Sequence, residues 1–435
     1  MENNTEIKTD LAIIGAGMAG MAAAVFAANR GISAVVVGGA GAFEYSSGLL
    51  DLWALTRPEL KVCKNPWQGI GQISKFWPRH PFLKMGELDI GKAFDELTAA
   101  LGKNGLPYGG HPSKNSGIIT AFGTLKPTYR FPLTMANNIA ALAEKKPILL
   151  LDFKGLREFR ARFVQQVLSA TLQNVHIGAI DFPQMANRSE LFTPLMAQAM
   201  ETEQVQDKFV AAVRPLLNGE SYLGIPAILG INGSYEIQKR LEGLLGIKVF
   251  EIPTSPVSVP GIRLKETFKK ALEDSSVTRL PDRRVYSASS FSGSAFSGSA
   301  VPGKGFILEA NTLGTNGARI QANACLLATG RFLSKGLVSD RKGVREPVFN
   351  LPVDQPETRK DWHGATYFDP KGHAINQAGV TTDSALRPLG KENTPAHETL
   401  YAAGSILAGQ DWMRTRSGAG LSIATAFHAI QQMTF

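Results

Sequence analysis

The feature that most constrains this chain is a glycine pattern near its N-terminus, set between an apolar run and an alanine-rich stretch. Residues 11–14 are apolar, GAGMAG follows at 15–20, and residues 21–29 have the composition of a helix. Gly31 is a typical helix stop, and a second apolar run covers 32–37. These roughly 30 residues predict a strand, a helix and a second strand parallel to the first.

The three glycines stand in the spacing GxGxxG, which is typical of a loop that holds a pyrophosphate. Gly15 permits the tight turn, Gly17 lets phosphates approach the backbone, and Gly20 allows the helix to pack closely on the strand. At Met18 and Ala19 the helix begins, and its free N–H groups and positive dipole end favour an anion. A glycine turn without a nucleotide is the alternative, which the flanking strand and helix disfavour.

The second strand lacks the acidic residue that ordinarily holds the ribose of an adenosine group. It ends at Val37 and is followed by Gly38 and Gly39. This weakens an assignment to NAD and also to FAD bound in the usual way. A cofactor without adenosine, an adenosine held by the backbone, or a carboxylate reaching back from Glu44 would each explain the loss.

Composition excludes several classes of protein. The 435 residues suggest two or three domains, and 46 Lys and Arg against 37 Asp and Glu give a charge of +9, which favours anionic partners. With only Cys63 and Cys325, the chain lacks ligands for a disulfide framework, a four-thiolate zinc site or an all-cysteine iron–sulfur cluster. The seven histidines show no HExxH spacing, so no metal site is predicted.

Other features predict a cytoplasmic protein that spans no membrane. The first ten residues are polar and include Glu2 and Glu6, unlike a secretory signal, and no uninterrupted apolar run approaches about 18 residues. No basic patch interleaved with aromatic residues is evident, so nucleic acid is not an expected partner.

Changes in texture along the chain predict three segments. Residues 112–250 include long stretches without glycine, such as 189–217, and we interpret them as a separate middle domain. Residues 251–261 carry three prolines and mark a return crossing. We therefore expect an α/β protein whose Rossmann-like parallel-sheet domain is discontinuous, formed by 1–111 and 251–435 around the middle domain.

Local patterns in the last segment predict further elements. Residues 263–273 are helical in composition, and the Ser- and Gly-rich residues 287–300 indicate an exposed flexible loop. Residues 306–309 and 319–322 flank a Gly-Thr-Asn-Gly turn and predict a hairpin, which is followed by a buried strand at 324–328.

Two motifs near the C-terminus resemble those of flavoproteins with two dinucleotide-binding domains. ACLLATG at 324–330 resembles their ATG motif through Thr329 and Gly330, and LYAAGS at 400–405 resembles the final strand that approaches the ribityl chain of the flavin. That strand usually ends in Gly-Asp, whereas here Gly404 is followed by Ser405, whose hydroxyl offers a neutral hydrogen bond.

A helix begins just after these motifs, with Gly418, Gly420 and Leu421 in its first turn. Its N-terminus, directed at the flavin, would stabilise negative charge on the reduced ring. Arg414 and Arg416 precede it and are either positive charges for a flavin or phosphate, or exposed loop arginines.

Four stretches in order along nearly the whole chain resemble the B subunit family of anaerobic glycerol-3-phosphate dehydrogenase. They are YSSGLLDL at 45–52, VPGIRL at 259–264, ATGRFLSKGLV at 328–338 and AAGSILAGQD at 402–411. The resemblance implies a flavoprotein that binds FMN, with FAD as the alternative. It implies two partners, the catalytic A subunit with FAD and the iron–sulfur C subunit, which passes electrons to membrane quinone.

The implied reaction is oxidation of sn-glycerol 3-phosphate to dihydroxyacetone phosphate, in a complex attached peripherally to the inner face of the cell membrane through those partners.

Within this resemblance Ser46, Ser47 and Gly48 would lie near the flavin. Alternatively, the serines cap a helix over 49–55. No residue is assigned as the catalytic base: any of the seven histidines could serve, but a structural role is expected for each. Arginines such as Arg130 could bind a substrate phosphate, but they are expected at the solvated surface. A flavin protein that only relays electrons or assists assembly, and a flavin-dependent RNA-modifying enzyme, are the other functions considered.

Overall fold

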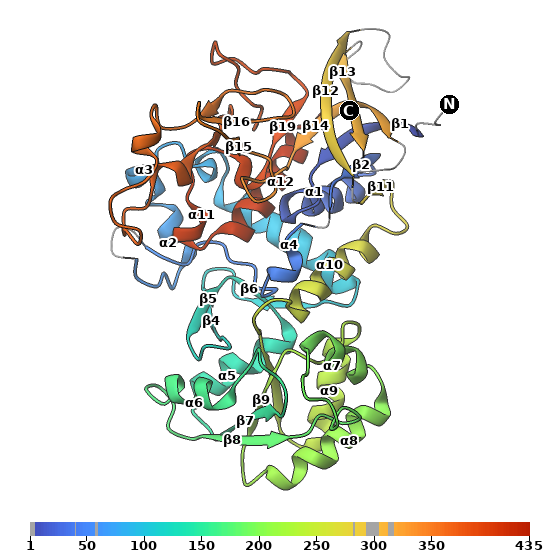
Figure 1. Ribbon diagram of the computed structural model, residues 1–435, viewed down its shortest axis with the longest axis vertical. Helices are drawn as coiled ribbons and strands as arrows, with labels where there is room; N and C mark the ends of the chain where they lie inside the picture. The colour runs from blue at the N-terminus through green and yellow to red at the C-terminus, as the bar shows by residue number, and fades with distance from the viewer. Residues whose placement is uncertain (1–4, 40, 57–59, 282, 293–303, 312–316) are drawn as a thin grey trace. The chain divides into compact units, whose positions relative to one another are not determined.

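The computed structural model describes residues 5–39, 41–56, 60–281, 283–292, 304–311 and 317–435 (Figure 1). By its internal contacts the chain divides into two compact units. The first comprises Met1–Gly41, Asp51–Leu97 and Ala271–Phe435, and the second comprises Ala42–Leu50 and Thr98–Lys270. Both units contain parallel sheet, which confirms the expected α/β class. The predicted middle domain, 112–250, lies within the second unit, and its role as a domain of separate function stays a prediction.

The first unit is built on a seven-stranded sheet with the order β11-β2-β1-β14-β13-β12, in which β19 also pairs with β14. β1, β2, β11, β14 and β19 run parallel, whereas β12 and β13 continue the sheet antiparallel. The strands are β1 (Thr5–Ile14), β2 (Ala34–Val37), β11 (Val277–Leu280), β12 (Arg284–Ser292), β13 (Lys304–Asn311), β14 (Ala318–Leu327) and β19 (Leu400–Ala402).

The strand, helix and strand predicted at the N-terminus are confirmed. β1 pairs with β2 in parallel, and between them lies α1 (Met18–Asn29), a helix that is buried over most of its length because it is apolar on every side. α1 packs against α12 (Gly418–Gln432), where the rings of Phe26 and Phe427 meet edge to face at 5.1 Å. The two ends of the chain therefore share one core.

The hairpin predicted from two short runs is also confirmed, because β13 pairs antiparallel with β14, and its turn at 312–316 lies outside the described residues. The loop predicted for 287–300 is partly wrong. Its first residues, up to Ser292, belong to β12, where pairing with β13 satisfies the backbone and the ring of Phe291 lies close to Gly305. The remainder, from 293, lies outside the described residues.

The first unit also contains short elements that connect the sheet. Its helices are α2 (Pro66–Ile70), α3 (Ile73–Phe76), η2 (Pro81–Lys84), η5 (Arg359–Asp361), η6 (Ala374–Gln377), η7 (Gly404–Ile406) and α11 (Trp412–Thr415), and α4 (Glu87–Lys103) begins in this unit and ends in the second. Its minor strands are β15 (Val338–Ser339), β16 (Val344–Arg345), β17 (Val353–Asp354) and β18 (Gly379–Val380).

The second unit has its own four-stranded parallel sheet, with the order β10-β9-β7-β8. Apolar side chains of these strands and of the surrounding helices form one core cluster. The strands are β7 (Ile148–Phe153), β8 (Val175–Ile180), β9 (Tyr222–Pro226) and β10 (Lys248–Ile252), and the helices are α5 (Ala136–Glu144), α6 (Ala161–Leu168), α7 (Thr193–Met200), α8 (Glu203–Val213), α9 (Ser234–Leu245) and α10 (Val259–Ala271), whose last residue belongs to the first unit.

Two small antiparallel pairs and three single turns complete the second unit. They are β3 (Tyr108–Gly110) with β6 (Arg130–Pro132), β4 (Ser116–Ile119) with β5 (Leu125–Thr128), η1 (Phe43–Tyr45), η3 (Leu133–Met135) and η4 (Arg214–Leu216). The three prolines of residues 251–261 do not exclude regular structure from this segment. β10 reaches Ile252, and α10 already contains Pro260, because a proline in the first turn of a helix removes no hydrogen bond.

Candidate functional site

Four strands of the first unit end side by side, and the predicted cofactor motifs follow three of these ends. Ile14 is paired with both Val37 and Leu327, and Leu327 is paired with Ala402. The glycine loop follows β1, the ATG motif follows β14, and Gly404 lies two residues after β19. In parallel sheets, ligands bind outside the carboxyl ends of the strands, so this edge is the candidate site.

The glycine loop has the backbone geometry that its spacing predicts. Gly15 has φ of +112°, and a side chain there would strike the carbonyl of Ala328. A side chain at Gly20 would strike the carbonyl of Gly15, so only glycine lets α1 approach the loop this closely. At Gly17, by contrast, an added Cβ would meet no atom within 4 Å.

The open space at Gly17 lies at the start of a helix. Gly17 is the N-cap of α1, and no side chain caps the helix there. Met18, in the first turn, is half-buried and Ala19 is buried. Uncapped N–H groups beside open space suit an anion.

The ATG motif and the final strand approach each other. Gly330 has φ of +71°, and a Cβ there would lie 2.5 Å from Ser334 Oγ and 3.7 Å from Ser405 Oγ. Thr329 Oγ1 is buried and has no hydrogen-bond partner within the described residues. A buried hydroxyl without a partner is expected where a polar ligand completes the hydrogen bonds.

Gly404 joins the final strand to the glycine loop. It has φ of +79°, and a Cβ there would lie 2.8 Å from the Cβ of Ala19 in α1. Its N–H donates to Thr425 Oγ1 at 2.8 Å, which ties the strand to α12. The motifs at the two ends of the chain therefore form one surface within the first unit.

The start of α12 contacts Asp51 and Leu52, the first residues of the Asp51–Leu97 segment of the first unit. Gly420 donates its N–H to the carbonyl of Asp51 at 2.7 Å, and a Cβ at Gly420 would lie 2.8 Å from the Cα of Leu52. Ser417 is the N-cap, is fully buried, and forms no side-chain cap. Gly418 is half-buried beside Trp412, and Leu421 is fully buried, so Leu421 belongs to the core.

The two arginines before α12 differ in environment. Arg414 Nε lies 3.2 Å from Asp411 Oδ2, so its charge is paired inside the protein. Arg416 is exposed and has a left-handed backbone with φ of +49°. The loop interpretation therefore fits Arg416 better than Arg414.

Ser46, Ser47 and Gly48 belong to the second unit. Ser46 Oγ accepts the N–H of Gly48 at 3.1 Å, and Lys126 Nζ donates to Ser47 Oγ at 3.4 Å. Tyr108 Oη donates to the carbonyl of Gly48 at 2.8 Å. The alternative that the serines cap a helix is wrong, because residues 49–55 are not helical. Their role beside a flavin stays a prediction.

The end of β2 offers no carboxylate to a ribose. A side chain at Gly38 would lie 3.0 Å from the backbone nitrogen of Ala16, so the chain passes too close to the glycine loop for an acid there. Glu44, the proposed substitute, belongs to the second unit and forms an ion pair with Lys265 at 2.7 Å. The first unit thus offers open space for a phosphate at Gly17 and a buried hydroxyl at Thr329 without a described partner, and an adenosine would have to be held by other groups.

Sequence reasoning missed two side chains that support this edge. Thr425 accepts the hydrogen bond from Gly404, although a threonine inside an apolar helix gives no signal of that partner. Arg331, directly after the ATG motif, donates to the carbonyls of Ile375 and Asn376 and so anchors the motif to a distant loop. Burial lowers the pKa of Arg331, against the opposing charge of Asp411.

The remaining candidates from the sequence are Arg130, the histidines and the two cysteines. Arg130 was expected at the surface, and this is wrong: it is 8% exposed and donates to the carbonyls of His111 and Tyr129. Within the described ranges, no group of three or more His, Cys, Asp or Glu side chains is arranged to hold a metal ion. Cys63 and Cys325 are both buried and unbridged.

Comparison with known proteins gives matches that cover most of the chain. The model of the family described as FAD binding domain matches residues 10–421. Proteins named as the B subunit of anaerobic glycerol-3-phosphate dehydrogenase are 27% identical in Aliivibrio fischeri, over 98% of this chain and 95% of the relative, and 26% identical in Vibrio cholerae, over 98% and 96%. A protein of Halobacterium salinarum named as a probable B subunit of the same enzyme is 28% identical over 97% of each chain. These relatives confirm the resemblance found in the sequence.

Solved structures match over most of the chain but at low similarity. The 3-ketosteroid delta1-dehydrogenase of Sterolibacterium denitrificans matches 98% of this chain and 99% of its own with a TM-score of 0.40 and 10% identity. The 3-ketosteroid-delta4-(5alpha)-dehydrogenase of Rhodococcus jostii matches 99% and 96% with a TM-score of 0.33 and 11% identity. Similarity at this level carries no argument about substrate. Flavin binding rests on the family match, which names FAD and does not support FMN, and by that match the chain belongs to the FAD-binding-domain family.

Proposed function

We propose that this protein is the flavin-binding B subunit of an anaerobic glycerol-3-phosphate dehydrogenase. The observation that carries the proposal is the meeting of the glycine loop, the ATG motif and the final strand at one sheet edge, in a chain that aligns over 98% of its length with proteins of that name. The reaction is oxidation of sn-glycerol 3-phosphate to dihydroxyacetone phosphate.

The cofactor that we propose is FAD rather than FMN. The description of the matched family supports FAD, whereas the glycines after β2 leave the ribose without its usual acid. Gly17 and the start of α1 would hold the phosphates, and Thr329 and Ser405 would hydrogen-bond the ribityl chain. A bound flavin supplies a two-electron acceptor that can release its electrons singly.

The helix starts at this edge have defined electrostatic roles in the proposal. The N-terminus of α1 offsets the charge of the phosphates, and the 15-residue helix α12 presents a second positive end, which stabilises negative charge on a nearby ligand. Oxidation of an alcohol removes a hydride and a proton, so the reaction also requires a base, for which no residue is assigned.

The partners of this protein follow from its role in the proposal. Two cysteines cannot ligate an all-cysteine iron–sulfur cluster alone, so the iron–sulfur relay of the proposed complex must come from another chain, the C subunit. The catalytic A subunit with FAD completes the complex, and quinone is the final acceptor. In the part of the chain that the structure describes, no helix is both long and apolar enough to cross a membrane. We propose that the complex attaches to the inner face of the cell membrane through these partners.

The cofactor can be tested directly by releasing it from purified protein and measuring its mass. FAD supports the proposal, FMN would return the assignment to the cofactor implied by the resemblance, and NAD would overturn it. The matched variants are Gly17→Glu, which puts a carboxylate into the open space at the start of α1, and Gly243→Glu, which puts one on the exposed surface of α9. We expect at least about tenfold less bound flavin for Gly17→Glu alone, because like charges repel at the phosphate position.

The substrate step is tested by adding sn-glycerol 3-phosphate to the flavin-loaded protein without oxygen. Loss of flavin absorbance with this chain alone places the oxidation here. Loss of absorbance that appears only after the A subunit is added, and that exceeds what the FAD of the A subunit accounts for, gives this chain an electron-transfer role. If absorbance is retained in the complete complex, the proposed reaction is refuted.

A further inference from the structure

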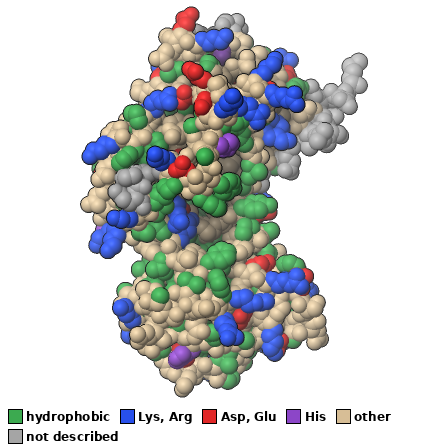
Figure 2. All heavy atoms as spheres, turned by 60° about the vertical axis from the view of Figure 1, so that its left-hand side comes forward, with side chains coloured by type: hydrophobic (Ala, Val, Ile, Leu, Met, Phe, Trp, Pro, Cys, Tyr) green, Lys and Arg blue, Asp and Glu red, His purple; other side chains and the backbone are tan. Residues whose placement is uncertain are grey.

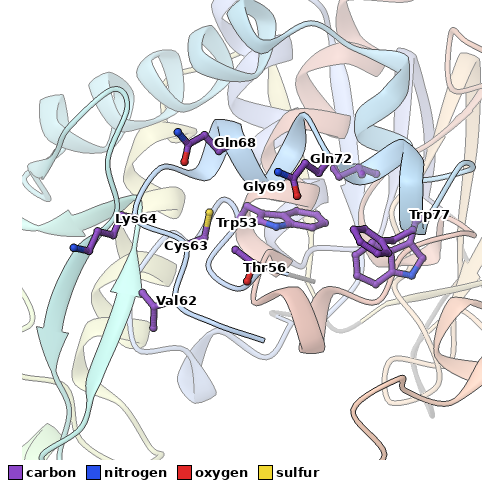
Figure 3. A pocket seen from close by; sticks show the side chains of 11 residues that line it. Trp53, Thr56, Val62, Cys63, Lys64, Gln68, Gly69, Gln72 and Trp77 are labelled. Carbon is purple, nitrogen blue, oxygen red and sulfur yellow. The ribbon is translucent and has the colours of Figure 1, made fainter. Parts of the chain in front are cut away.

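A recess in the first unit lies outside the edge that carries the cofactor motifs. Its volume is about 330 Å³, and it lies between residues 53–56 and 62–64 on one side and the short helices α2 and α3 on the other (Figure 3). We propose that this recess binds an aromatic anion, meaning a flat aromatic group of one or two rings that carries a carboxylate, sulfonate or phosphate. The proposal is independent of the proposed function, since it is tested by binding alone.

The apolar part of the recess consists of aromatic rings held in fixed positions. Trp53 and Trp77 are 2% and 7% exposed, and their rings meet edge to face at 5.8 Å. Trp53 lies directly against Gly69, where any larger side chain would clash with its indole ring. Phe76 and Val62, at 43% and 59% exposed, present much more of their surface to solvent. Pockets of this size lined by aromatic rings suit small aromatic ligands.

A second layer of packing keeps the tryptophans in place. His80 is buried against Trp53, Trp77 and Phe82, with ring centroids 5.0 to 6.4 Å away. Its Nδ1 accepts the N–H of Phe82 at 3.1 Å. Burial lowers the pKa of His80 to about 3, so its ring remains neutral beside the apolar floor. The recess is therefore preformed.

The polar part of the recess carries positive charge. Lys64, Gln68, Gln72 and Thr56 line it, and among the described residues that line it none is acidic. In Figure 3 the Lys64 side chain extends at the edge of the recess, away from the indole of Trp53. Burial raises the pKa of the Cys63 thiol, which donates to the carbonyl of Asn65 at 2.9 Å and stays neutral.

The residues around the recess add to its positive charge. Residues 60–86 contain five Lys and Arg and no Asp or Glu. Arg79 is paired with Asp354 at 3.0 Å, and Lys84 donates to Thr382, but Lys61, Lys64 and Lys75 are exposed and form no ion pair within the described residues. Figure 2, which turns the side of α2 and α3 forward, shows Lys and Arg side chains beside hydrophobic ones on this unit. Aromatic walls, together with an ammonium at the edge that forms no ion pair with any described residue, select an aromatic anion over a neutral ring.

The recess is also joined to the predicted cofactor edge by backbone hydrogen bonds. Ala54, next to Trp53, donates its N–H to the carbonyl of Thr415 at 2.9 Å, and the carbonyl of Asp51 accepts the N–H of Gly420 in α12. The chain segment that forms the floor of the recess therefore also supports the start of α12.

The test is calorimetric titration of the flavin-loaded full chain with 8-anilinonaphthalene-1-sulfonate, an aromatic anion, and with its neutral analogue N-phenyl-1-naphthylamine. We expect one anionic dye per chain. Lys64→Gln should weaken its binding about fivefold and leave the neutral dye unaffected, because only one exposed charge pair is lost. Gln72→Trp fills the recess and should abolish binding of the anionic dye, whereas Lys208→Gln, on the second unit, is the matched control and should change nothing.

Thermal unfolding of each variant first establishes that it folds, and the exposed position of Lys64 makes its variant informative even where Gln72→Trp does not fold. The proposal is overturned if the anionic dye does not bind, or if several dyes bind per chain and Gln72→Trp leaves them in place. It is overturned equally if the neutral dye binds as tightly as the anionic one and Lys64→Gln has no effect. That last result would indicate an apolar contact, such as a partner side chain, in place of an anion.

Discussion

Replacing Glu251 with glutamine removes one charge from an ion pair that lies wholly inside the second unit. Glu251 and Arg263 are 0% and 1% exposed, and the two outer nitrogens of Arg263 donate to the carboxylate at 2.5 and 2.8 Å. The same carboxylate accepts the N–H of Leu229 at 2.7 Å, and Arg263 Nε donates to the carbonyl of Gly230 at 2.7 Å. Glutamine preserves the shape but leaves the guanidinium charge buried without a counter-charge.

The expected loss follows from that burial. Breaking a buried pair by changing one partner costs about 3–5 kcal/mol, and because the amide keeps part of the hydrogen bonding we expect about 3 kcal/mol. The double variant Glu251→Leu, Arg263→Met removes both charges and should lose less stability than Glu251→Gln does. Burial alone would raise the pKa of Glu251, but the charge and hydrogen bonds of Arg263 outweigh it and lower the pKa. The stabilisation is therefore present at neutral pH and disappears as the pH falls through the lowered pKa, so the two proteins should converge in acid.

The positions of the tryptophans make the assay selective. All five, at positions 53, 67, 77, 362 and 412, belong to the first unit, so their fluorescence follows that unit, while far-UV circular dichroism follows both. In a urea titration, Glu251→Gln should shift the part of the circular-dichroism transition that comes from the second unit to lower urea concentration. Fluorescence, which follows the first unit, should not detect this shift. A loss below about 1 kcal/mol, or a double variant as unstable as the single one, would refute the reasoning.

Three further predictions concern the first unit. His80 has its pKa lowered from 6.5 to about 3 by burial, so the unfolded chain binds the extra proton first and stability should fall by about 2 kcal/mol between pH 6.5 and about pH 5; His80→Phe should flatten this dependence in melting curves. Gly20→Val should abolish flavin binding and lower the melting temperature, since its Cβ would strike the carbonyl of Gly15; normal flavin content in that variant would refute the assigned packing. Ser405→Ala should weaken flavin binding about fivefold, the effect of one hydrogen bond of about 1 kcal/mol, as measured by reconstitution of the flavin-free protein; unchanged affinity would exclude a ribityl contact.

The cofactor edge is the part of the fold that sequence predicts best, because its constraints are local. Gly15 and Gly20 are required by backbone approach within a few residues, and the apolar runs on either side have the lengths of a strand and a helix. That Gly330 lies near Ser405 could be expected only from the resemblance to flavoprotein motifs, since no local rule links two loops separated by 75 residues of sequence.

The second parallel sheet was not predicted, because its strands give no distinctive signal. β7 is a short apolar run, ILLLDF, and a run of this length is equally compatible with a buried helix. The Ser-rich end of β12 was assigned to a loop for a similar reason: its strand conformation depends on pairing with β13, and the pairing partner is not visible locally. Arg130 was placed at the surface because arginine usually lies there, whereas here backbone carbonyls satisfy its charge.

The two parallel sheets differ in the loops after their central strands, and this difference favours the first unit for the nucleotide binding that we propose. In the second unit the strand order reverses between β7 and β9, which is where open parallel sheets ordinarily bind ligands. The loop after β9 directs its amides at the chain's own carboxylates: Ile231 and Asn232 donate to Glu201 at 2.9 and 2.8 Å. The N–H of Leu229 likewise donates to the carboxylate of Glu251. An anion entering that loop would have to displace a covalently tethered carboxylate, whereas at Gly17 the start of α1 has no side-chain cap and faces open space. The same physical preference of loop amides for negative charge is thus satisfied internally in one unit and left for a ligand in the other.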